Sequence, residues 1–188
     1  TKQYDTSATL SGAALTPTNK VGIDAISLVG YGSYGSANAG STTYTINNIV
    51  LSGADAANYS VAGVTLSGST NISQAPVTVS GLSAANKVYD ATSTAALSGA
   101  LSITGLLTGD SSTVSGNVTG SFASPNVGNG LTVTANVSGL TLSNTNYYVA
   151  GVTIPLSANI TAAPVTISGL TASNKVYDTG ITASLTGT

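Results

Sequence analysis

The sequence predicts an all-β protein built from small domains in tandem. Three observations support this prediction: short segments that alternate apolar and polar residues, Gly- and Asn-rich turns between them, and an internal repeat. β-Branched Val, Ile and Thr are abundant, as strands prefer, and no long segment holds a helical period. We expect antiparallel β-sandwiches of the immunoglobulin-like type in an elongated array, with a β-grasp-like domain as the alternative.

The repeat is visible when the segment from Asn58 to Asp90 is aligned with the segment from Asn146 to Asp178. The offset is 88 residues without a gap, and 23 of the 33 aligned positions are identical. A period of this length exceeds the ~20–50 residues of a solenoid turn, so the units are expected to be independent beads.

The unit is expected to begin at the segment APVTV, where a proline follows a polar linker-like stretch and precedes a strand pattern. On this interpretation residues 1–74 are a first repeat without its opening strand, and residues 75–162 are a complete second repeat. Residues 163–188 begin a third repeat, so the chain is expected to be part of a longer array.

Several strands and turns are expected in order along the chain. Val77 and Val79 should share one face of a strand that begins the second repeat, with Thr78 and Ser80 on the other face. The same alternation predicts a strand through Leu131, Val133, Ala135 and Val137. Further candidates are the strands 61–66 and 149–154, the turns 115–121 and 126–130, and a single helical turn near 53–59.

Low charge limits the partners of this chain. Charged residues make up 5% of it, and its four lysines without any arginine cannot neutralise a phosphate backbone, so nucleic acid is excluded as a partner. No apolar run reaches the ~18 residues of a membrane span, so direct membrane insertion is not expected. No signal peptide is visible, which places any targeting segment outside this sequence. The absence of cysteine, with the wealth of Thr, Asn and Gly, is typical of large exported bacterial proteins.

The sequence contains few of the residue types that form catalytic or metal-binding sites. Without histidine or glutamate, a Ser-His-Asp triad is impossible, and a transition-metal site lacks its usual ligands. The six aspartates are scattered rather than clustered as in a calcium loop. We therefore expect no enzyme activity, no catalytic residue, no metal and no cofactor.

A tetrapeptide, K-x-Y-D, recurs once in each repeat and holds three of the four lysines and three of the six aspartates. Its members are Lys2, Tyr4, Asp5, Lys87, Tyr89, Asp90, Lys175, Tyr177 and Asp178. The structural interpretation is a pin, in which the lysine packs along an apolar surface, the tyrosine enters a core and the aspartate caps a turn. The alternative is chemistry, as a catalytic pair or a lysine–asparagine crosslink.

Other tyrosines suggest two further roles. The segment DAANYSV resembles the tyrosine corner of immunoglobulin-like domains, which makes Tyr59 and its counterpart Tyr147 candidate corner residues. A sugar-binding patch around Tyr31, Tyr34 and Tyr44 is the alternative to packing at core and edge positions.

Several blocks in order give the chain a resemblance to a known family. The segment APVTISGLTASNKVYDTG, with SGADAANY and FASPNVGNG, resembles the YDG repeat domain of bacterial filamentous-haemagglutinin-like adhesins. Ala91, Thr179 and Thr6 stand where that family usually has glycine after the aspartate. The resemblance implies a large surface-exposed or released protein, often exported by two-partner secretion, in which such repeats form a stalk.

We expect a structural function: stalk or spacer repeats of a secreted bacterial surface adhesin or biofilm-matrix protein, located outside the cell or on its surface. The alternative is a carbohydrate- or matrix-binding module that uses a Tyr, Asn and Thr surface. The expected partners are neighbouring repeats of the same protein. Because the first repeat lacks its opening strand and residues 164–188 supply one, head-to-tail self-association by strand addition is a further hypothesis.

Overall fold

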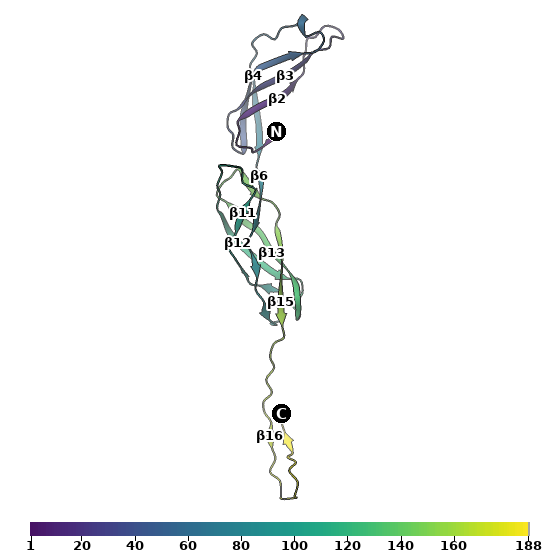
Figure 1. The fold of residues 1–188 in the computed structure, drawn as a ribbon, viewed down its shortest axis with the longest axis vertical. Helices are drawn as coiled ribbons and strands as arrows, with labels where there is room; N and C mark the ends of the chain where they lie inside the picture. The colour runs from purple at the N-terminus through teal and green to yellow at the C-terminus, as the bar shows by residue number, and fades with distance from the viewer. Residues whose placement is uncertain (188) are drawn as a thin grey trace.

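A computed structural model describes residues 1–187 and confirms that the chain is all-β. Its strands are interrupted by one single-turn 3-10 helix, η1 (Ala56–Asn58), where the helical turn was expected. The strands form two successive assemblies followed by an extended C-terminal segment, so the molecule is long and narrow (Figure 1). Within residues 1–187, no helix has the length and apolar character needed to cross a membrane.

The first repeat forms a curled five-stranded sheet in the order β1-β5-β4-β3-β2. Its strands are β1 (Lys2–Gln3), β2 (Thr9–Leu15), β3 (Ser27–Tyr34), β4 (Gly40–Ser52) and β5 (Leu66–Ser73). All neighbours are antiparallel except β1, which runs parallel to β5 with Lys2 opposite Ile72. The K-x-Y-D motif therefore begins on the edge strand next to the last strand of its own repeat.

The second repeat builds the same sheet in the order β8-β15-β13-β12-β9. Its strands are β8 (Lys87–Val88), β9 (Thr94–Ala95), β12 (Val114–Phe122), β13 (Gly128–Leu142) and β15 (Thr153–Thr161). Strand β8 is parallel to β15 with Lys87 opposite Ile160, as β1 is to β5. The repeated sequence thus gives a repeated topology.

The second repeat also holds a three-stranded sheet in the order β11-β6-β14. These strands are β6 (Ala75–Ser80), β11 (Ser102–Thr104) and β14 (Tyr147–Val149), and a two-residue pair joins β7 (Ser83–Ala84) to β10 (Leu97–Ser98). The alternation predicted for β6 is confirmed, because Val77 and Val79 are buried while Thr78 and Ser80 face outward. The two outward hydroxyls pair across the strand with those of Thr104 and Ser102, at 2.6 and 2.9 Å.

Strand β13 supplies most of the core of the second repeat, and its predicted alternation is confirmed. Val133 packs with Phe122 and Ile160 in one buried cluster. Val137 and Leu140 pack with Val79 of β6 in another, which joins the five-stranded sheet to the three-stranded one. Removing this apolar surface from water is the main stabilising term, at roughly 25 cal/mol per Å².

One turn prediction, 115–121, and two strand predictions, 61–66 and 149–154, are wrong. Residues 115–121 were expected to form a turn but lie inside β12, because Gly120 serves close strand approach: a Cβ there would meet the Ala95 carbonyl oxygen at 2.8 Å. The expected strand 149–154 is broken between Val149 and Thr153, where Gly151 has a φ of +87°. In the first repeat the corresponding strand begins only at Leu66.

The two repeats differ in how much core they enclose. In the first repeat the buried apolar residues are Tyr4, Leu10, Ile46 and Ile72. The second repeat has twelve, including Val77 and Val79 from the three-stranded sheet. Among the described residues, the first repeat has no strand that corresponds to β6, and its core is smaller for that reason.

The C-terminal segment extends away from the second repeat (Figure 1). Residues 163–187 are exposed throughout and carry one two-residue pair, β16 (Thr171–Ala172) with β17 (Leu185–Thr186). Residues 163–168 match β6 in sequence, yet no described strand pairs with them. Val165 and Ile167 are therefore 89% and 87% exposed.

Candidate functional site

The K-x-Y-D motif forms the same charged loop in every repeat. The lysine Nζ lies 2.5 Å from the aspartate Oδ1 in the first and third repeats and 2.6 Å in the second. The same Oδ1 accepts a hydrogen bond from the backbone N–H two residues on, at 2.9 Å from Ser7, Thr92 and Gly180. The aspartate thus caps a tight turn while it holds the lysine.

The lysine closes the other side of this loop. Lys87 Nζ donates to the carbonyl oxygens of Thr92 and Thr94 at 2.8 and 3.2 Å, and Lys2 and Lys175 make equivalent bonds. In the second repeat the ammonium also lies 5.7 Å from the ring centre of Phe122, which adds a cation–π contact. The loop surrounds a fixed positive charge with oxygen atoms, so it is stiff without a bound metal.

These contacts lower the pKa of the aspartate. The hydrogen bond from Lys87, helped by the Thr92 N–H, lowers the pKa of Asp90 to about 2. Asp5 and Asp178 are shifted downward for the same reason. The ion pair and the capped turn are the contacts that the structural interpretation as a pin predicts for the lysine and the aspartate.

The residue after the aspartate explains the preference for glycine in the resembling family. Thr6, Ala91 and Thr179 have φ values of +67°, +64° and +64°, in the left-handed region that side chains with a Cβ avoid. Glycine would adopt this conformation without strain.

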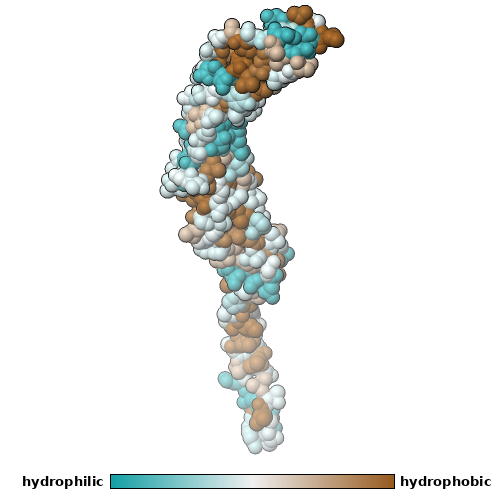
Figure 2. Space-filling model, turned by 45° about the horizontal axis from the view of Figure 1, so that its top comes forward, coloured by the Kyte–Doolittle hydropathy of each residue, from teal (hydrophilic) through white to brown (hydrophobic). Residues whose placement is uncertain are grey.

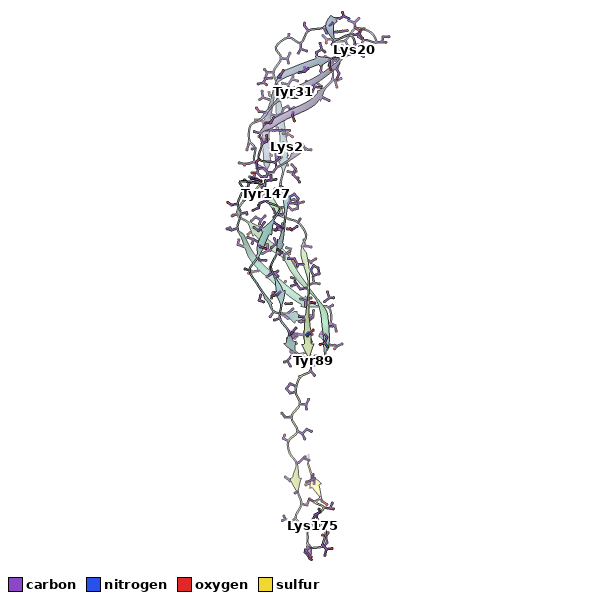
Figure 3. All side chains as sticks on the ribbon, in the orientation of Figure 1. Lys2, Lys20, Tyr31, Tyr89, Tyr147 and Lys175 are labelled. Carbon is purple, nitrogen blue, oxygen red and sulfur yellow. The ribbon has the colours of Figure 1, made fainter. Side chains whose placement is uncertain are left out.

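The motif tyrosine points away from the loop and into the next repeat. The Tyr4 hydroxyl donates to Asp110 Oδ2 at 2.9 Å, and the Tyr147 hydroxyl donates to the same oxygen at 2.6 Å. The two rings meet edge to face with centroids 5.4 Å apart. Figure 3 shows Lys2 and Tyr147 close together between the two repeats. One carboxylate therefore joins a tyrosine from each repeat; we call these three residues the tyrosine clasp.

Burial of the two tyrosine side chains strengthens the clasp. Tyr4 and Tyr147 are 7% and 2% exposed, and they share an apolar cluster with Ile72 of the first repeat and Val77 of the second. Burial, and then the Asp110 carboxylate, raise the pKa of both tyrosines. Both hydroxyls consequently stay protonated and donate at neutral pH.

Polar contacts complete the junction around the clasp. Only Gln74 separates β5 from β6, and its Nε2 donates to the carbonyl oxygens of Thr145 and Tyr147 at 2.9 and 3.2 Å. The Asn146 side chain accepts from the Ala39 N–H at 2.8 Å and donates to Asn38 at 3.2 Å. The linker is therefore held on both sides rather than free to bend.

At the end of the first repeat that faces away from the second repeat, Tyr59 and Asp24 form a pair like that of Tyr147 and Asp110, and we call this pair the half clasp. Tyr59 donates to Asp24 Oδ2 at 2.7 Å and accepts from the Val21 N–H at 2.8 Å. Tyr147 makes the same two bonds, to Asp110 and from Leu107. The Asp24 contact raises the pKa of Tyr59. The candidate corner tyrosines thus bond to a distant loop and its aspartate.

The remaining motif tyrosines have no such partner among the described residues. Tyr89 lies at the far end of the second repeat (Figure 3) and is 40% exposed. Tyr177 is 87% exposed. Of the expected sugar-binding patch, Tyr34 packs under Lys2, whose Nζ lies 5.3 Å from its ring centre. Within residues 1–187, no three metal-binding side chains gather.

Sequence reasoning missed the aspartates of the clasp. The spacing of the aspartates argues against a calcium loop or a catalytic carboxylate pair but assigns no role to Asp24 or Asp110, and no pattern singles out Gln74, Asn38 or Asn146. A signal exists: each aspartate lies three residues after an apolar residue, Val21 or Leu107, and the two pairs are 86 residues apart. Without the fold, nothing connects either aspartate to a tyrosine.

Fold and site together define an all-β tandem-repeat protein whose units interlock through a recurring K-x-Y-D motif. Comparison with known families matches the YDG domain over residues 1–66 and 73–154, one match in each of the first two repeats. The chain belongs to the YDG domain family. Comparisons with curated proteins and with solved structures found no match.

The left-handed residue gives a first prediction. Ala91→Gly should stabilise the second repeat by about 1 kcal/mol, because glycine removes the strain of a positive φ. Thermal unfolding followed by calorimetry measures the change. Ala96→Gly is the matched control, since Ala96 is also exposed but is not among the residues of positive φ, and it should give no gain. Equal effects of the two changes would contradict the explanation.

The charged loop gives a second prediction, on pH. Because the pKa of Asp90 falls from 3.8 to about 2 on folding, its carboxylate stabilises the fold above about pH 4. That contribution should be lost as the pH falls through 2. An NMR titration of the carboxyl group measures the pKa directly, and Lys87→Met should return it toward 3.8. A pKa of Asp90 that does not respond to this change would contradict the assignment.

Proposed function

We propose that this chain is a non-enzymatic spacer: immunoglobulin-like sandwich repeats in the stalk of a large secreted bacterial surface adhesin or biofilm-matrix protein. We further propose that this protein is of the filamentous-haemagglutinin-like type, exported by two-partner secretion and located outside the cell. The observation that carries the proposal is the tyrosine clasp, because it fixes the orientation of one repeat on the next. Neighbouring repeats are accordingly the principal partners.

Rigidity follows from the contacts at the junction. Domains joined by a small polar interface are expected to move relative to one another. Here the linker is one residue, Gln74, and a buried cluster with contributions from both repeats lies beside it. A chain of such junctions would hold a distal region away from the surface that anchors it, as a stalk must.

The sandwich arrangement is supported by the packing of Val79 from the three-stranded sheet on Val137 and Leu140 of the five-stranded one. A β-grasp-like domain would need a helix across its sheet. Within residues 1–187 the only helical element is the single turn η1.

The surface supports a soluble spacer with few ions. Hydroxyl pairs line the outside of neighbouring strands, such as Thr78 with Thr104 at 2.6 Å and Ser115 with Thr141 at 3.1 Å. These paired hydroxyls give the elongated molecule a polar, hydrated surface that carries no fixed charge.

The absence of free acid groups supports a non-enzymatic role. Each aspartate has a structural partner. Asp5, Asp90 and Asp178 each pair with a lysine. Asp24 and Asp110 accept from tyrosine hydroxyls, and Asp55 accepts from the Ala25 N–H. None of them is left over to act as a general acid or base.

A carbohydrate- or matrix-binding function is the second candidate. Tyr34 and Tyr44 lie opposite each other on β3 and β4 and line one open pocket of about 400 Å³, which supports this candidate. Tyr34 also packs against the buried cluster at the junction. Binding of the intact chain on a glycan array would favour this candidate.

The junction gives a third prediction. Asp110→Ala leaves two tyrosine hydroxyls without their acceptor, at a cost of roughly 1.5–3 kcal/mol per bond to the charged group. Small-angle X-ray scattering at high dilution should show a single long particle for the native chain. For the variant it should show a broad range of shorter ones.

Asp55→Ala is the matched control, since its carboxylate accepts only from the Ala25 N–H at the outer end of the first repeat. Its scattering should be that of the native chain. A native chain that is already compact or broadly bent would contradict the spacer function.

A further inference from the structure

A pull along the long axis of the molecule acts on two strands of the second repeat. The chain enters this repeat at the start of β6, directly after Gln74, and leaves it at Thr161, the last residue of β15. Figure 1 shows these two points at opposite ends of the repeat. Figure 2 shows that the molecule narrows to the width of an extended chain beyond the second repeat. Tension is therefore concentrated on β6 and β15.

Both of these strands are arranged to meet such a pull in shear. Strand β6 lies between β14, which is parallel to it, and β11, which is antiparallel. Strand β15 lies in the same way between β8 and β13. The hydrogen bonds lie across the strands, so a pull along a strand strains all of its bonds together. A pull across the strands would break the same bonds one pair at a time.

The end of β15 is held by the segment that carries the K-x-Y-D motif. The Asn159 N–H donates to Asn86 Oδ1 at 2.7 Å, and the Tyr89 N–H donates to the Thr161 carbonyl oxygen at 2.8 Å. On the other side of β15, the register with β13 shifts within residues 158–160. The last residues of β15 consequently depend on β8 and the residues beside it for support.

Strand β8 has only two residues, so it can hold β15 only if it is itself anchored. Lys87 provides the anchor. Its Nζ donates at 3.2 Å to the carbonyl oxygen of Thr94, which belongs to β9 at the opposite edge of the same sheet. The ammonium also lies 5.7 Å from the ring centre of Phe122 in β12. One side chain thus connects the two edges of the five-stranded sheet and can transfer tension from β8 to β9 and β12.

We propose that the K-x-Y-D loop is a mechanical clamp, which lets a repeat withstand tension along the molecule, and that Lys87 anchors the clamp of the second repeat. This proposal rests on the proposed stalk function, because a stalk is pulled along its length when its two ends are held apart.

The recurrence of the motif supports a mechanical role. Units joined in series all carry the same tension, so the weakest unit yields first and each repeat needs its own clamp. The first repeat has the same arrangement, in which the Tyr4 N–H donates to the carbonyl oxygen of Ser73, the last residue of β5, at 2.8 Å. Lys2 Nζ donates there to the carbonyl oxygen of Ser7, and Lys175 Nζ to that of Gly180 in the third copy of the motif.

Pulling single molecules of the 188-residue chain in optical tweezers tests the proposal. The sequence has no cysteine, so Ser73→Cys and Ala163→Cys, both at exposed positions, give two attachment points that load the second repeat along its length. At a fixed force, Lys87→Met should raise the unfolding rate roughly tenfold, because bonds to a charged group are lost before the transition state. Unfolding of this repeat is recognised by a release of roughly 300 Å of chain.

A second direction of pulling separates the clamp from general stability. Ser115 and Thr141 lie opposite each other on β12 and β13, so Ser115→Cys and Thr141→Cys direct the pull across the strands. The native chain should unfold at a lower force in this direction than along its length. Lys87→Met should change the rate little here, because β8 and β15 are not loaded first.

Lys20→Met is the matched control, since Lys20 Nζ also donates to a backbone carbonyl oxygen, that of Asp24 at 3.0 Å, but outside the loaded repeat. It should leave the unfolding rate unchanged. Equal unfolding forces of the native chain in the two directions would overturn the proposal, and this comparison needs no change at Lys87. An effect of Lys87→Met that is absent along the length, or equal in both directions, would also overturn it. None of these results bears on the spacer function, which scattering tests without applied force.

Discussion

One carboxylate shared by two tyrosine hydroxyls is the interaction on which the arrangement of repeats depends. Tyr4 and Tyr147 are buried, and a buried hydroxyl without a partner costs free energy of about 1–3 kcal/mol. Asp110 satisfies both at once, and within residues 1–187 no buried side-chain nitrogen or oxygen lacks a partner. Each repeat must therefore carry the aspartate and its corner tyrosine at one end and the motif tyrosine at the other.

This constraint explains why a chain so poor in charge concentrates its charged residues in K-x-Y-D. Lys87 and Asp90 shape a stiff loop beside the last strand of the repeat, and both are held by backbone groups of the same loop. The loop positions the tyrosine between them for the next repeat. The charges fix local geometry, while Tyr4 makes the contact between the first and second repeats.

Sequence patterns predicted the parts of the fold that depend on local alternation and on the repeat. Val77 and Val79 alternate with hydroxyl residues, and the long run through Val133 does the same, so both strands could be predicted. The clasp could not, because Tyr4 and Asp110 are 106 positions apart and no period connects them. The prediction of a turn over residues 115–121 was wrong because the glycines there allow close packing of strands and do not form a turn. The positive φ of Ala91 could not be predicted either, because alanine is not a residue type that favours the left-handed region.

A double-mutant cycle between Tyr4→Phe and Asp110→Ala tests the clasp most directly. Urea unfolding of the native chain, the two single variants and the double variant gives the coupling free energy between the two side chains. The clasp predicts a coupling of about 1 kcal/mol or more, because each single change already breaks the same bond. Strictly additive effects would show that the two repeats do not communicate through this carboxylate, and would contradict the account of a rigid junction.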